Sequence, residues 1–226
     1  MSVTVKICGL AAPEALDAAL DAGADMVGFV FFPPSPRHVT FAAARTMAAR
    51  VRGRAEKVAL TVDADDALLE GIVEALHPDV LQLHGHEPPA RVASLKKRFG
   101  LPVMKAIAVA AAEDLASVET YAAVADRLLF DARAPREATR PGGLGNVFDW
   151  RLLQNIRPGV PFMLSGGLDV GNVADALRIT RAPGVDVSSG VERVPGEKDP
   201  EKIRAFVRAA RAAAAHLAVH SIASHA

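Results

Sequence analysis

The sequence predicts a single (β/α)8 barrel domain spanning residues 1–226, and two observations carry this prediction. Short β-branched or apolar runs recur along the chain, and alanine- and leucine-rich stretches with helical spacing lie between them. The runs begin near Val3, Met26, Lys57, Asp79, Pro102, Arg127, Pro161 and Val185. Eight strand–helix units at this pitch favour a closed barrel over an open doubly wound sheet, which is the main alternative.

The clearest helices follow the first three predicted strands, and another ends the chain. Helices are expected over residues 13–22, 41–51, 66–76 and 205–226. Pro13 suits the first turn of a helix, where its missing N–H is not needed. Thr40, Asp65 and Asp169 are predicted N-caps, because their short polar side chains can accept from a free backbone N–H.

Two predicted loops are unusually long. One spans residues 32–39 after the second strand, and the other spans 132–148 after the sixth. In a barrel, the loops that follow strands lie on the C-terminal face, where active sites form. Long loops without secondary structure in a compact domain are usually functional. We therefore expect both loops to contribute to a site at this face.

Composition restricts the class of protein. The chain carries 26 basic and 26 acidic residues, so its net charge does not favour nucleic acid or a membrane as a partner. A single cysteine excludes an internal disulfide and fits a reducing compartment. No signal peptide is evident near Met1, and no apolar run reaches the roughly 20 residues that span a bilayer. A soluble, cytoplasmic protein is expected.

Glycine-containing turns follow the last two predicted strands. Ser165-Gly166-Gly167 follows the seventh strand, and Ser188-Ser189-Gly190 follows the eighth. Backbone N–H groups in such turns bind oxyanions, and loops seven and eight are the recurring phosphate site of this fold. We predict a phosphate site there, with Gly142 and Gly143 as a third element. The alternatives are ordinary turns and, for Gly142-Gly143, a flexible loop tip.

Cys8 and Asp131 are the candidate proton-transfer groups. They end the first and sixth strands, which are not neighbours in an eight-membered ring, so the two side chains can face each other across its mouth. One group could then remove a proton while the other donates one. The thiol would need a nearby positive charge, and the carboxyl would need desolvation or a neighbouring negative charge. Alternatively, Cys8 is a buried residue that only fills space in the core, and Asp131 is a residue at a strand end whose carboxylate binds a backbone N–H.

Other polar residues at strand ends are candidates for substrate binding. Arg37 follows three prolines that stiffen its loop, and a guanidinium suits bidentate recognition of a carboxylate. Gln82 and His84 alternate in the fourth strand, so they point to the same side. They would either line the pocket or form a polar layer inside the barrel, with their hydrogen bonds made to other protein groups. The same two interpretations apply to Lys105 and Asp186.

Neither a metal nor an organic cofactor is expected. The chain has no Cys-x-x-Cys and no His-Glu-x-x-His, which are common zinc-binding patterns. No Gly-x-Gly-x-x-Gly dinucleotide fingerprint follows a predicted strand.

Short motifs in a fixed order span nearly the whole chain. They are Lys6-Ile7-Cys8-Gly9-Leu10, Gly28-Phe29-Val30-Phe31 with Ser35-Pro36-Arg37, Leu81-Gln82-Leu83-His84-Gly85, Phe130-Asp131, Gly142-Gly143 with Phe148-Asp149-Trp150, Ser165-Gly166-Gly167-Leu168, and Asp186-Val187-Ser188-Ser189-Gly190-Val191-Glu192. Each motif is modest alone, but the ordered set is specific. It resembles the phosphoribosylanthranilate isomerase family of tryptophan biosynthesis, and so does Pro195-Gly196-Glu197-Lys198-Asp199.

The resemblance implies an Amadori rearrangement without a cofactor. N-(5-phosphoribosyl)anthranilate would become 1-(2-carboxyphenylamino)-1-deoxyribulose 5-phosphate, the third step of tryptophan biosynthesis from chorismate. Cys8 would be the general base, Asp131 the general acid, and Arg37 the residue that holds the anthranilate carboxylate. A small-molecule substrate is the expected partner, in a monomer or a homodimer.

The chain departs from the family pattern in the glycine-rich loop. Leu144 stands where Thr or Ser is usual, and Asn146-Val147 replaces a more polar pair. A hydroxyl partner is therefore missing from the loop. Two other functions stay open, an epimerase-like sugar-phosphate enzyme and a non-catalytic phosphometabolite-binding barrel. The first would need a metal held by paired histidines and aspartates, and the second would lack Cys8 or Asp131.

Overall fold

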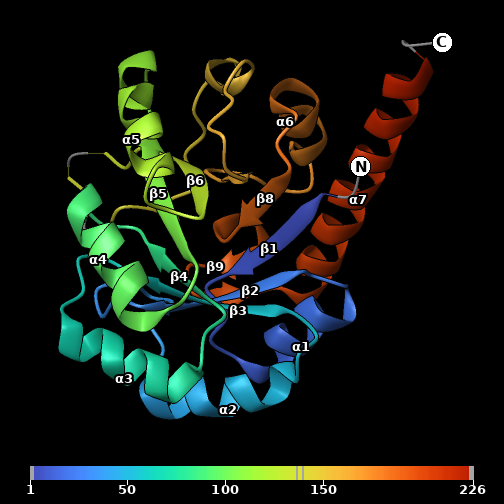
Figure 1. Cartoon of the computed structure of the whole chain (residues 1–226). Coiled ribbons are helices and arrows are strands. Elements are labelled where there is room, and N and C mark those ends of the chain that lie inside the picture. The colour runs from blue at the N-terminus through green and yellow to red at the C-terminus, as the bar shows by residue number, and fades with distance from the viewer. Residues whose placement is uncertain (1–2, 136, 139, 224–226) are drawn as a thin grey trace.

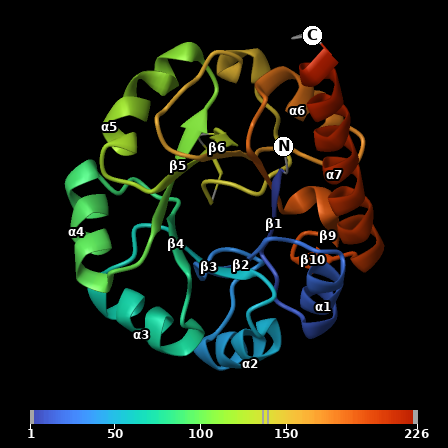
Figure 2. The same ribbon diagram turned by 45° about the vertical axis from the view of Figure 1, so that its right-hand side comes forward.

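Eight parallel strands close into a barrel, and each strand pairs with the strands that precede and follow it along the chain. The structure is a computed structural model that describes residues 3–135, 137–138 and 140–223. The strands are β1 (Thr4–Cys8), β2 (Met26–Phe31), β3 (Glu56–Thr61), β4 (Val80–Leu83), β5 (Val103–Val109), β6 (Arg127–Ala132), β7 (Phe162–Leu164) and β8 (Gly184–Val187). Figures 1 and 2 show the helices as an outer ring around these strands. The predicted (β/α)8 barrel is confirmed, and every strand begins within one residue of its predicted start.

The helices cover the outside of the barrel. They are α1 (Pro13–Asp21), α2 (Phe41–Val51), α3 (Asp66–Leu76), α4 (Pro89–Phe99), α5 (Val118–Ala122), α6 (Val173–Thr180) and α7 (Pro200–Ala223), with 3-10 turns η1 (Ala112–Ser117), η2 (Trp150–Leu153) and η3 (Ser189–Val191). A two-stranded hairpin, β9 (Glu192–Val194) and β10 (Glu197–Lys198), follows η3. No helix among the described residues is long and apolar enough to cross a membrane.

Two of the three predicted N-caps are confirmed. Thr40 and Asp65 precede α2 and α3, and their side chains accept from the N–H groups three residues on. The prediction for Asp169 is wrong, because α6 begins only at Val173. The Asp169 carboxylate instead accepts from the N–H groups of Gly171 and Asn172, within the turn before the helix.

The final helix begins earlier than the sequence predicts. It starts at Pro200 rather than near residue 205. Asp199 Oδ1 accepts from the N–H of Glu201 at 2.9 Å, which stabilises the first turn, and proline suits that position. The predicted end, residues 224–226, lies outside the described residues.

The sixth unit departs from the predicted strand–helix repeat. Between β6 and β7 the described residues form only η2, and the chain before it runs as a long loop. Phe148 and Leu153 are buried there and cover the barrel in place of a helix. The extra chain is therefore free to extend over the C-terminal face, where the loops after the strands lie.

Apolar side chains fill the N-terminal half of the barrel interior. A buried cluster comprises Met26, Val58, Val80, Met104, Ala106, Leu129 and Met163, mostly from the beginnings of strands. An ion pair between Arg127 and Glu56 lies at the same end. Polar side chains of the interior are thereby left to the C-terminal half.

Candidate active site

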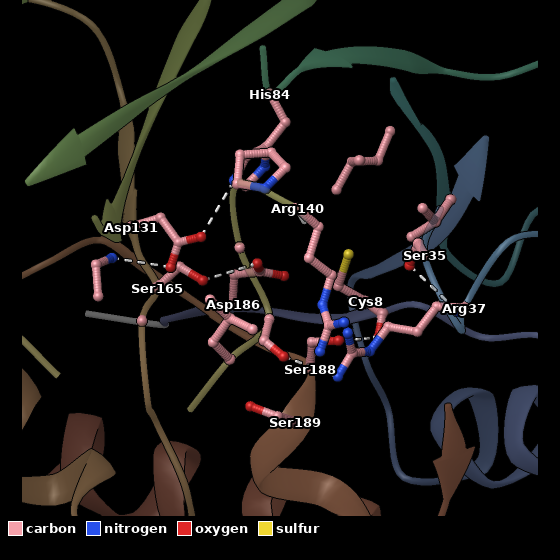
Figure 3. Close-up of a pocket in the computed structure, with 18 of the residues that line it drawn as sticks. Cys8, Ser35, Arg37, His84, Asp131, Arg140, Ser165, Asp186, Ser188 and Ser189 are labelled. Carbon is pink, nitrogen blue, oxygen red and sulfur yellow. Dashed lines mark hydrogen bonds and ion pairs between the residues drawn. The ribbon is translucent and has the colours of Figure 1, made fainter. Parts of the chain in front are cut away.

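A pocket opens at the C-terminal ends of the strands, and most predicted site residues line it. Its polar lining includes Cys8, Ser35, Arg37, His84, Asp131, Arg140, Ser165, Asp186, Ser188 and Ser189 (Figure 3). Its apolar lining includes Val30, Phe32, Leu60 and Val62, which belong to β2, β3 and the loops after them. The pocket therefore has an apolar side near Cys8 and a polar side at β7 and β8.

Cys8 ends β1 above a buried ion pair. Lys6 lies two residues earlier, and its Nζ is 2.8 Å from Asp186 Oδ1. The parallel pairing of β1 with β8 places Lys6 opposite Asp186. Ser165 Oγ donates to Asp186 Oδ2 at 3.1 Å, so both carboxylate oxygens have a donor.

The environment of Cys8 combines burial with a fixed positive charge. Burial raises the pKa of the Cys8 thiol, and the Lys6 ammonium opposes that rise. Burial alone would lower the pKa of Lys6, but Asp186 and Cys8 hold that pKa above its ordinary value. Gly28 leaves room for this arrangement, since a Cβ there would lie 3.0 Å from Cys8 Sγ and 3.2 Å from Lys6 Nζ. Lys6 thus stays charged beside the thiol, which is what a thiolate requires.

Asp131, on β6, is held by a hydrogen-bonded chain from β4 and the residue after it. His84 Nε2 lies 3.1 Å from Asp131 Oδ2, and Gln82 Nε2 lies 3.0 Å from His84 Nδ1. When the Gln82 amide donates to Nδ1, the neutral imidazole carries its proton on Nε2 and donates it to Asp131. Asp131 Oδ1 accepts from the N–H of Ala132 at 2.9 Å. The carboxyl is therefore oriented from two sides.

Arg37 is held by a buried acid from the far end of the chain. Its Nε and NH2 donate to the two carboxylate oxygens of Glu192 at 2.8 and 2.7 Å, and NH2 also donates to Gly143 O at 3.0 Å. Lys198 Nζ donates to Glu192 Oε1 at 2.6 Å and to Ser188 O and Oγ at 2.9 and 3.1 Å. The bidentate fork predicted for a ligand is thus occupied by Glu192. Among the described residues, NH1 is the one guanidinium nitrogen of Arg37 that makes no hydrogen bond.

We expect Arg37→Ala to lower the free energy of unfolding by about 3 kcal/mol, because removing one partner of a buried ion pair leaves an uncompensated charge. Both side chains are only 4% exposed. Urea unfolding followed by circular dichroism measures the change. The matched control is Arg178→Ala, which breaks an exposed pair with Asp175 and should change stability by less than about 0.5 kcal/mol. Equal changes in the free energy of unfolding of the two variants would show that the buried pair contributes no more stability than the exposed pair.

The two predicted phosphate turns meet at the ends of β7 and β8. Residues 165–167, 188 and 189 line the pocket, whereas Gly190 is not among the lining residues. Gly166 has φ of 85°, and a Cβ there would lie 2.5 Å from the backbone N of Ala132. A Cβ on Gly190 would lie 2.0 Å from Leu168 O. Gly190 therefore permits close packing of the two turns rather than contact with a ligand.

Gly142 and Gly143 bring the loop after β6 over the pocket. A Cβ on Gly142 would lie 2.5 Å from Asp131 Oδ2, and one on Gly143 would lie 2.6 Å from Arg37 NH1. Gly143 also has φ of 69°, which favours glycine. The absence of side chains at these two positions lets the loop approach both Asp131 and Arg37.

Two residues considered from the sequence do not line the pocket. Gln82 is wholly buried and contacts His84, so it orients that ring. Lys105 is also buried, and its Nζ donates to Gly85 O at 2.7 Å and to Glu87 Oε2 at 3.0 Å. Lys105 thereby fixes the loop after β4, which carries His84.

Four residues at or beside the pocket have no role in the sequence-based predictions. They are Lys6, Arg140, Glu192 and Lys198. Strand alternation could have found Lys6, which lies on the same face as Cys8.

Within the described parts of the chain, no group of three or more His, Cys, Asp or Glu residues could hold a metal ion.

Comparison with known proteins identifies the family. A family model described as N-(5'phosphoribosyl)anthranilate (PRA) isomerase matches residues 5–209. The chain belongs to this family. A PRA isomerase of Bradyrhizobium sp. (strain ORS 278) is 68% identical over 213 residues, covering 94% of this chain and 97% of that protein. A relative from Nitrobacter winogradskyi, with the same name, is also 68% identical over 213 residues, covering 94% of this chain and 95% of its own length.

Solved PRA isomerases share the fold. The crystal structure from Thermotoga maritima has a TM-score of 0.84 and 33% identity, and the match covers 93% of this chain and 99% of that one. A further PRA isomerase structure contains reduced 1-(o-carboxyphenylamino)-1-deoxyribulose 5-phosphate. Its TM-score is 0.81 at 31% identity, with 93% of this chain and 99% of that chain covered.

The departure from the family pattern lies on the pocket wall. Leu144 lines the PRA isomerase pocket of this chain and is 36% exposed, and Asn146 also lines it. An apolar side chain therefore lines the pocket at the position where the resemblance leads us to expect a hydroxyl. The backbone of the loop can still bind an anion, because N–H groups do not depend on the side chain.

Proposed function

We propose that this protein converts N-(5'-phosphoribosyl)anthranilate into 1-(2-carboxyphenylamino)-1-deoxyribulose 5-phosphate, with Cys8 as general base and Asp131 as general acid. It is an aldose–ketose isomerase of tryptophan biosynthesis, as its family membership implies. The observation that carries the assignment of roles is the placement of these two groups on different strands around one pocket (Figure 3). Acid–base pairs of this kind transfer protons to and from one bound substrate.

The reaction needs one proton donated and one removed. Asp131 protonates the furanose ring oxygen, the bond from C1 to that oxygen breaks, and the nitrogen lone pair forms a C1=N iminium. Cys8 then takes the proton from C2, and the electrons of that C–H bond form a C1=C2 enolamine. Tautomerisation transfers the C2 hydroxyl proton to C1 and leaves the C2 ketone. The iminium accepts the electrons, so no cofactor is expected.

The shape and charge of the pocket support one orientation of the substrate. The phosphate would lie against the turns of residues 165–167 and 188–189, whose N–H groups and hydroxyls suit an oxyanion. The aromatic ring would pack on the apolar side formed by Val30, Phe32, Leu60 and Val62. The ribose carbons then lie between the two sides, within reach of Cys8 and Asp131. Arg37 would direct NH1 toward the ring carboxylate.

The charge of Lys198 makes phosphate binding at the proposed site depend on pH. Burial lowers the pKa of Lys198 to about 8, against the attraction of Glu192. Its ammonium donates to Ser188, beside the proposed phosphate site, so the positive charge favours a bound phosphate. As the pH rises through about 8 this charge is lost. We expect the affinity for ribose 5-phosphate to fall by about threefold to tenfold between about pH 7 and pH 9.

Isothermal titration calorimetry at the two pH values measures this effect. The second ionisation of a sugar phosphate, near pH 6, is almost complete throughout the range. In Lys198→Met the affinity should be lower and nearly independent of pH, whereas Lys97→Met, which changes an exposed lysine on α4, should behave as the native protein does. A full pH dependence in Lys198→Met would assign the titration to another group.

A fluorescence assay tests the proposed function. The purified protein, in buffer with EDTA, should consume phosphoribosylanthranilate generated in situ, with loss of the anthranilate-type emission. No turnover by the native protein would overturn the proposal.

A monomeric or homodimeric state and a cytoplasmic location belong to the same proposal. Light scattering of the purified protein measures the oligomeric state.

A further inference from the structure

Arg140 is a second guanidinium in the pocket, and no hydrogen bond or ion pair joins it to another described residue. It belongs to the loop after β6 and lines the same pocket as Cys8, Arg37 and Asp131. Its Nε is buried, and among the described residues it has no hydrogen-bond partner. Figure 3 shows the Arg140 side chain reaching into the pocket, with its guanidinium directed toward that of Arg37.

The other buried basic and acidic side chains around the pocket each have a partner in an ion pair. Lys6 pairs with Asp186, His84 with Asp131, and Glu192 with both Arg37 and Lys198. No ion pair is found for Arg140 within the described residues. Two guanidinium groups directed toward each other repel unless an anion lies between them. The pocket therefore carries an excess positive charge at the Arg37 and Arg140 guanidinium groups.

Arg37 alone cannot provide a bidentate contact to a ligand. Its Nε and NH2 are used by Glu192, and NH2 is also used by Gly143 O, which leaves NH1. A carboxylate has two oxygens that each accept hydrogen bonds, so recognition by NH1 alone leaves one oxygen without a charged donor. A second donor beside Arg37 would complete the site.

We propose that Arg140 binds the carboxylate of the substrate's aromatic ring together with NH1 of Arg37, and so selects for substrates that carry this group. This inference rests on the proposed function, which supplies the aryl carboxylate. Arg140 is a binding residue here and takes no part in proton transfer. The phosphate has its own donors at the ends of β7 and β8, whereas Phe32 of the apolar side and Arg37 lie in the same loop after β2.

The test compares Arg140→Gln with the native protein. Three ligands are titrated by calorimetry: the reduced product 1-(2-carboxyphenylamino)-1-deoxyribitol 5-phosphate, the same compound made from aniline, and ribose 5-phosphate. Arg157→Gln is the matched control, because Arg157 is exposed and lies outside the pocket. Turnover of phosphoribosylanthranilate by the native protein is measured in parallel, so a failure of the proposed function is seen separately.

We expect Arg140→Gln to weaken binding of the carboxylated analogue by about tenfold, as for loss of one charge-assisted hydrogen bond. Binding of the aniline analogue and of ribose 5-phosphate should be nearly unchanged, and so should all three affinities in Arg157→Gln. KM should rise while kcat changes little, since the contact exists in both the ground state and the transition state. Equal loss for all three ligands would assign Arg140 to the phosphate or to loop folding. No loss for any ligand would remove it from the binding site. Either result overturns the inference.

Discussion

Cys8→Ala should lower kcat by about 10²- to 10⁴-fold, the usual contribution of a general base. The thiol lines the pocket and lies beside the buried Lys6 ammonium, and alanine cannot take the C2 proton. The substitution removes little volume, so the free energy of unfolding should change by roughly 1 kcal/mol. Single-turnover fluorescence of phosphoribosylanthranilate measures the rate, and urea unfolding measures the stability.

Cys8→Ser provides the matched control for size. The hydroxyl fills the same space, but it is a much weaker acid than a thiol and does not form an anion near neutral pH. Its turnover should therefore be as low as that of Cys8→Ala. A kcat close to the native value in Cys8→Ala would return the thiol to the role of a buried filler.

Asp131→Asn should also lose about 10²- to 10⁴-fold in kcat while it still binds the reduced product analogue. The amide keeps the shape of the carboxyl, and its single oxygen can accept from either His84 or the N–H of Ala132, so one of the two contacts that orient the group is retained. The amide cannot deliver the proton to the ring oxygen. Steady-state kinetics and calorimetry with the reduced product separate the loss of turnover from the loss of binding.

The double variant tests whether the two groups act in one reaction. If Cys8 and Asp131 serve consecutive proton transfers on the same substrate, Cys8→Ala combined with Asp131→Asn should be little worse than the poorer single variant. Fully multiplicative losses would contradict a shared reaction path. Weak binding of the reduced product by Asp131→Asn would instead make Asp131 a structural residue of the pocket.

Local patterns were sufficient for the barrel and for the strand-end residues. Strand alternation and the spacing of turns determine where each strand ends, and in a closed parallel barrel all strand ends meet at one face. Cys8, His84, Asp131 and Asp186 could therefore be predicted to lie together without knowledge of any contact. The N-cap prediction for Asp169 is wrong because an aspartate can accept from the N–H groups of a turn as readily as from those of a helix.

Long-range pairing limited the rest of the prediction. Arg37 and Glu192 are 155 positions apart, and no local signal indicates that one binds the other. The sequence therefore could not show that the Arg37 fork is already occupied. Arg140 lies in a loop without periodicity, so its direction depends on how that loop folds over the barrel. The alternation in β4 left two interpretations of Gln82 open, and the buried side chain fits a polar layer inside the barrel rather than the pocket lining.

The ion pair between Lys6 and Asp186 also has a consequence for the order of folding. The two residues are 180 positions apart, on the first and last strands of the barrel. The cation beside Cys8 can gain its counter-charge only when β8 docks against β1, and closing so large a loop is a slow, entropically demanding step. A chain that emerges from the ribosome without β8 therefore has a lysine near its thiol but no carboxylate to hold it. The reactive environment of Cys8 and the closed barrel are completed in the same event, so partly folded chains are expected to be catalytically silent.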